Sequence, residues 1–160
     1  MSSHVPPWVP VLFIVLVLLG YRQSLPRTVK PGTVVAIALA MAALSLYGVV
    51  GAFGAQPLVL LLWASGYALA VSAGARHFAA RGLTAVGSAV RMPGSWLPLV
   101  LLLAIFAARF VLGFAAGAHL PLLHSVVFVG LMSALLGALS GGFGARALAV
   151  HRCIMGARAA

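Results

Sequence analysis

Arg109 is the residue whose type and position most invite a chemical role. It is the one charged side chain inside an apolar stretch, and an arginine at the centre of a membrane helix costs about 2.5–3.5 kcal/mol on insertion scales. The chain has ten Lys and Arg residues and no Asp or Glu, so no side-chain carboxylate can pair with it. Backbone carbonyls, aromatic rings, water or an external anion remain as partners.

Two aromatic residues are expected at the depth of Arg109. At 1.5 Å per helical residue, Arg109 lies roughly 10 Å, Tyr47 about 9 Å and Trp63 about 8 Å from the same membrane surface. A desolvated contact between a guanidinium and an aromatic ring is worth about 2 kcal/mol. Arg109, Tyr47 and Trp63 therefore form a candidate ligand-binding group. Structural anchoring, or snorkelling of the arginine to a lipid headgroup, are the alternatives.

Three histidines are weaker candidates, for a metal site. Imidazoles bind Zn²⁺ or Cu²⁺, and His4, His119 and His124 are expected near one surface. However, His119 and His124 are five residues apart, not the four that share a helix face. The favoured interpretation is ordinary interfacial histidines, and we predict no metal and no cofactor.

The missing carboxylates exclude many enzyme classes. Neither a Ser-His-Asp triad nor a paired-carboxylate site can be assembled, and Mg²⁺ or Ca²⁺ would lack their usual ligands. Cys153 is the single cysteine, which excludes an intrachain disulfide. We expect a protein that is not an enzyme. An enzyme or redox subunit using histidine and a borrowed cofactor is a weaker option.

The composition predicts which elements position these residues. Hydrophobic residues make up 64% of the chain and charged residues 6%, outside the range of soluble domains, and a bilayer crossing takes roughly 20 apolar residues. We predict an all-α integral membrane bundle forming a single domain. It has five transmembrane helices, or four if the short first segment only dips in. The expected spans cover about 8–21, 32–53, 58–75, 96–116 and 122–141, followed by a basic cytoplasmic tail at 142–160.

The connection between the third and fourth spans is predicted to form a cytoplasmic interfacial helix. Polar residues recur there at helical spacing, although Gly82 and Gly87 favour an irregular loop as the alternative. The polar residues are His77, Arg81, Thr84, Ser88 and Arg91.

Basic residues indicate the orientation. They cluster at 22–30, 76–91 and 146–158, on one side of the predicted spans, and such clusters favour the cytoplasm. We expect a bacterial inner-membrane protein with a cytoplasmic C-terminus and, if the first segment crosses, a periplasmic N-terminus. The expected partners are the lipid bilayer and anionic lipids at the cytoplasmic face, rather than nucleic acid.

Small residues at four-residue spacing predict close helix contacts, because lipid-embedded helices associate by close backbone approach. This pattern favours a compact bundle and a homo-oligomer or a partner in a membrane complex. The expected packing residues are Gly66, Ala70 and Gly74 in the third span, Gly113 and Gly117 in the fourth, and Gly137 and Gly141 in the fifth.

Two segments carry a resemblance to a known family. Residues 93–110, Pro-Gly-Ser-Trp-Leu-Pro through Ala-Ala-Arg-Phe, and the first loop, residues 19–24 and 28–31, are similar to an uncharacterised family of small multi-pass proteobacterial inner-membrane proteins, a domain of unknown function. The resemblance implies a bacterial multi-pass protein with a basic residue at position 109, and it supplies no activity.

Two functions follow as hypotheses. The first is a non-enzymatic interaction or accessory protein packed through its small-residue faces. The alternative is a small carrier or binding protein for an anion or anionic lipid, with Arg109 as the binding charge.

Overall fold

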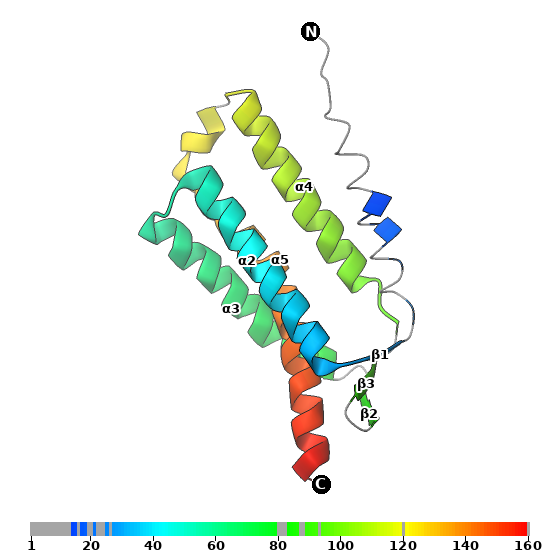
Figure 1. Cartoon of the computed structure of the whole chain (residues 1–160). Helices are drawn as coiled ribbons and strands as arrows, with labels where there is room; N and C mark the ends of the chain where they lie inside the picture. Colours follow the sequence, from blue (N-terminus) through cyan, green and yellow to red (C-terminus); the bar gives the residue numbers. More distant parts are fainter. Residues whose placement is uncertain are drawn as a thin grey trace.

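The computed structural model describes residues 14–15, 17–18, 21, 25, 27–79, 83–86, 89–92, 94–119 and 121–159. Its four long helices are α2 (Pro31–Phe53), α3 (Pro57–Ala79), α4 (Leu97–Gly117) and α5 (Val126–Ala159). A small sheet lies at the end of the bundle nearer the C-terminus, and the short 3-10 helix η1 (Pro121–His124) joins α4 to α5 at the other end (Figure 1). The first predicted span, 8–21, falls mostly outside the described residues.

All four helices are long and apolar enough to cross a membrane. Their most apolar windows have mean hydropathies of 1.8–2.5, yet only 17–33% of the residues in these windows are buried inside the structure. Most of their apolar side chains therefore face outward, which a bilayer tolerates and water does not. The prediction of a helical bundle is confirmed with four helices that are long and apolar enough to cross a membrane, and the count of five is not supported.

Proline and glycine set the helix ends between α2 and α3. Pro57 begins α3, where its missing N–H would have no intrahelical partner. Gly54 follows α2 with φ of 78°, a left-handed conformation that glycine adopts without strain, and its N–H donates to the Val50 carbonyl over 2.8 Å. The Gln56 side chain donates to the Phe53 carbonyl over 3.3 Å. These contacts make a tight hairpin of two spanning helices.

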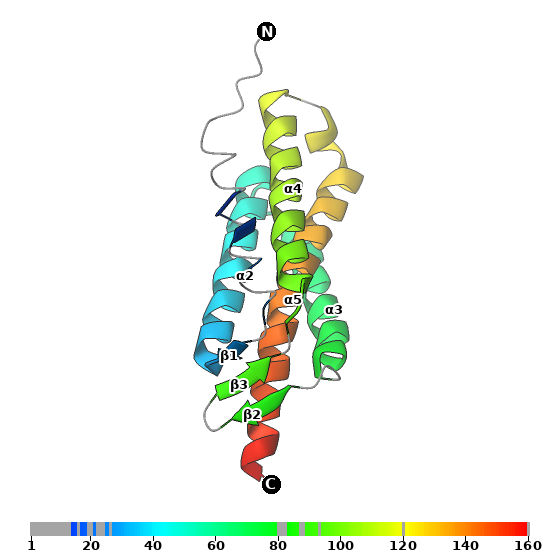
Figure 2. The ribbon, with the colours of Figure 1, turned by 90° about the vertical axis from the view of Figure 1, so that its right-hand side faces the viewer.

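Helix α5 is the centre of the bundle. It packs most extensively against α3, then against α2, and less against α4, whereas α2 and α4 meet at few places. In Figure 2 α5 runs behind α4, between α2 and α3. Apolar clusters join α5 to its neighbours along its length. The largest lies toward η1 and contains Val49, Phe53, Val59, Ala108, Leu112 and Leu136. Another lies toward the sheet and contains Ala38, Leu102, Ile105, Phe143 and Ala147.

A three-stranded antiparallel sheet stands where the interfacial helix was predicted, so that prediction is wrong. The strands β1 (Arg27–Val29), β2 (Thr84–Val86) and β3 (Ala89–Met92) are ordered β1-β3-β2. Val90 of the central strand is opposite Val29 on one side and Ala85 on the other.

The sheet has a physical reason that the polar spacing does not reveal. Gly82 and Gly87 weaken a helix, while the β-branched residues Thr84 and Val86 favour a strand. The remote segment 27–29 supplies a third strand, and Val90, fully buried, packs in one cluster with Val150 and Ile154 of α5. Burial against α5 thus outweighs the helical pattern.

Helix α5 continues to Ala159, whereas the sequence analysis separates a basic tail at 142–160. Glycines at 141, 142 and 144 would weaken an isolated helix. In the folded chain their backbone lies against Tyr67 of α3 or Leu101 of α4. Tertiary packing therefore keeps this stretch helical.

Candidate functional site

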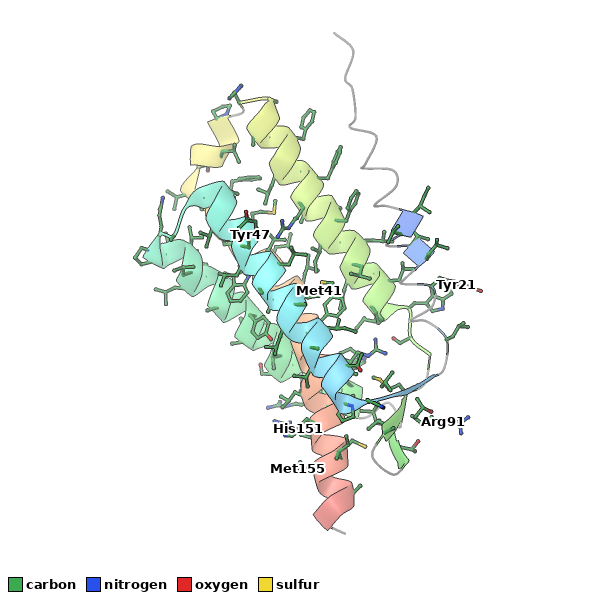
Figure 3. The ribbon with its side chains drawn as sticks, viewed as in Figure 1. Tyr21, Met41, Tyr47, Arg91, His151 and Met155 are labelled. Carbon is green, nitrogen blue, oxygen red and sulfur yellow. The ribbon has the colours of Figure 1, made fainter. Side chains whose placement is uncertain are left out.

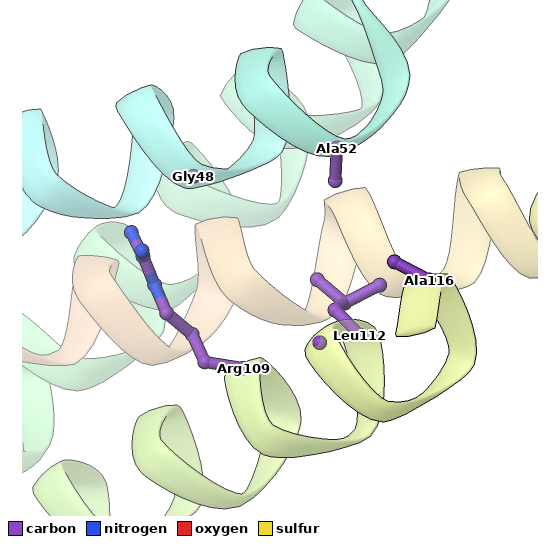
Figure 4. A pocket seen from close by; sticks show the side chains of 6 residues that line it. Gly48, Ala52, Arg109, Leu112 and Ala116 are labelled. Carbon is purple, nitrogen blue, oxygen red and sulfur yellow. The ribbon is translucent and has the colours of Figure 1, made fainter. Parts of the chain in front are cut away.

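Arg109 projects from α4 toward α2 (Figure 4). Its Nη2 atom donates a hydrogen bond to the backbone carbonyl of Leu44. Its Nε atom is buried and, within the part of the chain that the structure describes, has no hydrogen-bond partner. The guanidinium is thus held by the backbone of a neighbouring helix and retains donor capacity.

Gly48 provides the space in which the guanidinium rests. In an α-helix the carbonyl of residue 44 accepts from the N–H of residue 48, so Gly48 lies beside the Leu44 carbonyl. A Cβ atom added at position 48 would overlap the guanidinium, with Nη1 only 2.7 Å away. The absence of a side chain at this position lets Arg109 reach the α2 backbone.

A cavity of about 210 Å³ adjoins the guanidinium between α2 and α4. Leu112 is buried on its inner side, whereas Ala52, Gly113 and Ala116 are exposed. Arg109 is the only charged or polar side chain in the lining. The complete lining is Gly48, Ala52, Arg109, Leu112, Gly113 and Ala116.

The structure does not gather the three residues of the candidate ligand-binding group. Tyr47 is 77% exposed on α2 (Figure 3). The Trp63 ring stacks on Tyr67, with centroids 5.5 Å apart and planes at 22°, and its Nε1 atom donates to Ser45 Oγ over 3.1 Å. Of the partners that the sequence leaves open for Arg109, the described structure shows a backbone carbonyl and no aromatic ring.

Ser45 is a site residue that the sequence analysis does not identify. Its side chain is buried, accepts from Trp63 and donates over 3.0 Å to the Leu136 carbonyl of α5. It therefore links three helices, one residue from the carbonyl that holds Arg109. In the sequence, the only indication of this role is that a serine lies within an apolar span. The sequence does not indicate that Trp63 and Leu136 are its hydrogen-bond partners.

The small-residue faces of α3 and α5 lie against each other. A Cβ at Gly66 would meet the Ala134 carbonyl, and one at Gly137 would meet the Trp63 carbonyl. A Cβ at Gly141 would stand 2.9 Å from Ala70 Cβ, and one at Gly74 would stand 2.7 Å from Ala145 Cβ. The two backbones approach too closely for any side chain at these four glycines.

Gly113 and Gly117 behave differently. No atom lies within 4 Å of where their Cβ atoms would stand, and both residues are exposed. The close contact expected for this face of α4 is not made within the described chain, because α4 packs against α5 through Ala108 and Leu112 instead.

The histidine candidates are not brought into a described cluster. His119 is exposed, in a turn with φ of 50°, while His4 and the side chain of His124 lie outside the described residues. Among the described residues, no group of three or more His, Cys, Asp or Glu could hold a metal ion.

Basic side chains lie at the end of the bundle that carries the sheet. Lys30, Arg76, Arg91 and Arg152 are exposed, and Figure 3 shows Arg91 and His151 near this end. Arg146, which the sequence analysis places in the tail, is only 7% exposed. Its Nη2 atom lies 3.7 Å from Met92 Sδ, so it joins α5 to the sheet.

Comparison with known proteins places the chain in one family. No curated protein matches it, and no solved structure does either. The resemblance to an uncharacterised family that residues 93–110 carry is confirmed at the level of the family. The model of a family of unknown function, DUF6622, matches residues 1–159, and the chain belongs to this family.

Proposed function

We propose that this protein is a non-enzymatic bacterial inner-membrane protein that binds an anionic group at Arg109, in the cavity between α2 and α4. The observation that carries the proposal is a guanidinium beside an outward-opening cavity in a chain with no Asp or Glu. An arginine at this depth is expensive unless something compensates its charge.

The arginine has one described hydrogen bond, to the Leu44 carbonyl. A carbonyl carries only a partial negative charge, whereas a guanidinium has five N–H donors and binds carboxylate or phosphate through paired hydrogen bonds. Because no side chain of the protein is an anion, we take an external carboxylate or phosphate as the partner of this guanidinium. Binding or carriage of such a group is the activity.

The architecture supports a rigid frame with a looser helix beside it. Helices α3 and α5 meet through glycines with no room for side chains, while α2 and α4 touch at few places. A ligand between α2 and α4 would separate two helices that have little contact to lose.

Mass spectrometry of the protein, released from its own membranes in a neutral detergent, tests this proposal. The expected result is a bound anionic molecule on the wild-type protein and on Arg91→Gln, a matched loss of one exposed arginine. The molecule should be absent from Arg109→Gln and weakened in Arg109→Lys, because lysine keeps the charge but not the planar donor pair. Equal occupancy in the wild type and Arg109→Gln would refute it.

A second function, as an interaction or accessory protein, is favoured by the bare face of α4. Two exposed glycines, Gly113 and Gly117, are four residues apart, and the exposed Ala116 lies beside the second. Another helix could approach closely at this face. Gly113→Ile should then lower self-association or complex formation measured by cross-linking in membranes. Gly51→Ile is the control, since Gly51 also has no atom within 4 Å of an added Cβ. Equal effects would count against this function.

The proposed orientation puts the sheet and the C-terminus in the cytoplasm. The exposed basic residues at that end support it through their preference for the cytoplasmic side, where anionic lipids are natural partners.

A further inference from the structure

The walls of the α2/α4 cavity restrict the kind of anion that fits it. Five of the six lining residues are glycine, alanine or leucine, and Arg109 supplies the only charge. A free inorganic anion entering this cavity would exchange its water shell for one guanidinium and apolar walls. Unpaired polar atoms in apolar surroundings are costly. A small ion that must give up its water to enter is therefore a poor occupant of this cavity.

The surroundings of the cavity are apolar as well. Phe110, Val111 and Phe114 of α4 are 48%, 47% and 65% exposed, and they belong to a helix long and apolar enough to cross a membrane. The rim residues Ala52 and Ala116 are small, which leaves the opening unobstructed. In a bilayer, a ligand would reach this opening from the hydrocarbon layer, between two helices.

The volume of the cavity and its single positive charge limit the size of the acidic group that it can hold. A water molecule occupies about 30 Å³ in the liquid, so about 210 Å³ has room for one compact acidic group with the first few carbons behind it. A second charged group would find no partner in this lining. The remainder of a longer ligand would lie along the exposed apolar surface of α4.

We propose that the α2/α4 cavity admits, sideways from the lipid layer, an amphiphile with one acidic head, a carboxylate or a phosphate monoester, and an apolar tail. This inference rests on the proposed binding at Arg109 and names the ligand class. Gly48 is the residue that sets the resting position, because its missing side chain lets the guanidinium lie on the Leu44 carbonyl. The acidic head accepts hydrogen bonds from the guanidinium donors that the Leu44 carbonyl leaves free.

Equilibrium binding in nanodiscs of phosphatidylcholine tests the ligand class, with dodecyl phosphate and inorganic phosphate as labelled probes. The wild type should bind dodecyl phosphate saturably and at least about tenfold more tightly than Arg109→Gln, as expected for a hydrogen-bonded charge pair. Arg91→Gln should bind like the wild type. Inorganic phosphate should show no saturable binding over the same range.

A variant that narrows the cavity tests the location of the ligand without changing Arg109. Ala52→Leu fills the rim of the cavity without altering charge, and Ala43→Leu makes the same change at an exposed α2 position outside the lining. Ala52→Leu should weaken dodecyl phosphate binding severalfold, and Ala43→Leu should not. Equal binding by both leucine variants would overturn the location of the ligand.

The outcomes separate this inference from the function on which it rests. If inorganic phosphate binds as tightly as dodecyl phosphate and depends on Arg109, the amphiphile is wrong and anion binding stands. If dodecyl phosphate binds equally to the wild type and to Arg109→Gln, both are wrong.

Discussion

Trp63 and Ser45 are joined by a hydrogen bond of 3.1 Å between α3 and α2, with the indole as the donor. The Ser45 hydroxyl in turn donates a hydrogen bond of 3.0 Å to the Leu136 carbonyl of α5. Three helices that could slide past one another through apolar contacts alone are thereby fixed at one level. That level is next to Leu44, whose carbonyl holds Arg109.

Ser45→Ala should destabilise the bundle, because it removes the acceptor of the Trp63 indole. Hydrogen bonds between membrane helices contribute about 0.6 kcal/mol on average and up to about 1.7 kcal/mol, so we expect a loss of about 1 kcal/mol. Unfolding in mixed detergent micelles measures it. Ser65→Ala is the control, since Ser65 is exposed and bonds only to its own helix at the Leu62 carbonyl. An equal loss in the two variants would contradict the role of Ser45.

Gly137→Ala should be strongly destabilising. Its added methyl group would collide with the Trp63 carbonyl of α3, and overpacking of this kind typically costs about 1–3 kcal/mol. Gly113→Ala should have the opposite sign, since no atom lies within 4 Å and alanine is favoured over glycine inside a helix by about 0.5–1 kcal/mol. Thermal unfolding of both variants in detergent compares them. A destabilised Gly113→Ala would show that this face is already packed against a partner.

Val90→Asn should release the sheet from α5. Val90 is fully buried beside Val150. The asparagine variant would lose this apolar contact, and burial of its unpaired amide would cost about 1–3 kcal/mol more. Hydrogen exchange should rise at 89–92 and 27–29, while the spanning helices keep their protection. Thr84→Asn changes an exposed position of the same sheet and should leave exchange unaltered. Uniform protection in both variants would mean that the sheet does not depend on α5.

Labelling from one side of the membrane tests the proposed orientation. In a Cys153→Ala background, Gln56→Cys and Met155→Cys place single thiols at exposed positions near opposite ends of the bundle. An impermeant maleimide should label position 56 in intact spheroplasts and position 155 only after the membrane is opened. The reverse result would place the basic end outside.

Apolar stretches were sufficient to locate α2, α3, α4 and the first part of α5, because the length needed to cross a hydrocarbon layer leaves little freedom. The close contact between Gly66 and Gly137 faces also follows from spacing, since glycines that recur every fourth residue lie on one side of a helix. Gly113 shows the limit of that argument: its spacing is equally suitable, and the structure leaves it bare.

The binding group around Arg109 could not be assembled from depth alone. Tyr47 and Gly48 are neighbours in sequence and so lie about 100° apart around α2; the glycine faces the arginine and the tyrosine faces outward. The depth of a residue along the membrane normal is independent of how its helix is rotated about its own axis. The pairing of residues 27–29 with residues 89–92 could likewise not be predicted from local sequence patterns, because it joins segments that are distant in the sequence.

The continuity of α5 has a consequence for how the molecule sits in bilayers of different thickness. Thirty-four residues make a rod of about 51 Å, against a hydrocarbon thickness of about 30 Å. The C-terminal part of α5 packs against the sheet through Val150 and Ile154, which couples the orientation of the sheet to that of the helix. Tilting is one way in which a long helix accommodates hydrophobic mismatch, and a tilt of α5 would change the angle of the sheet to the membrane surface as well.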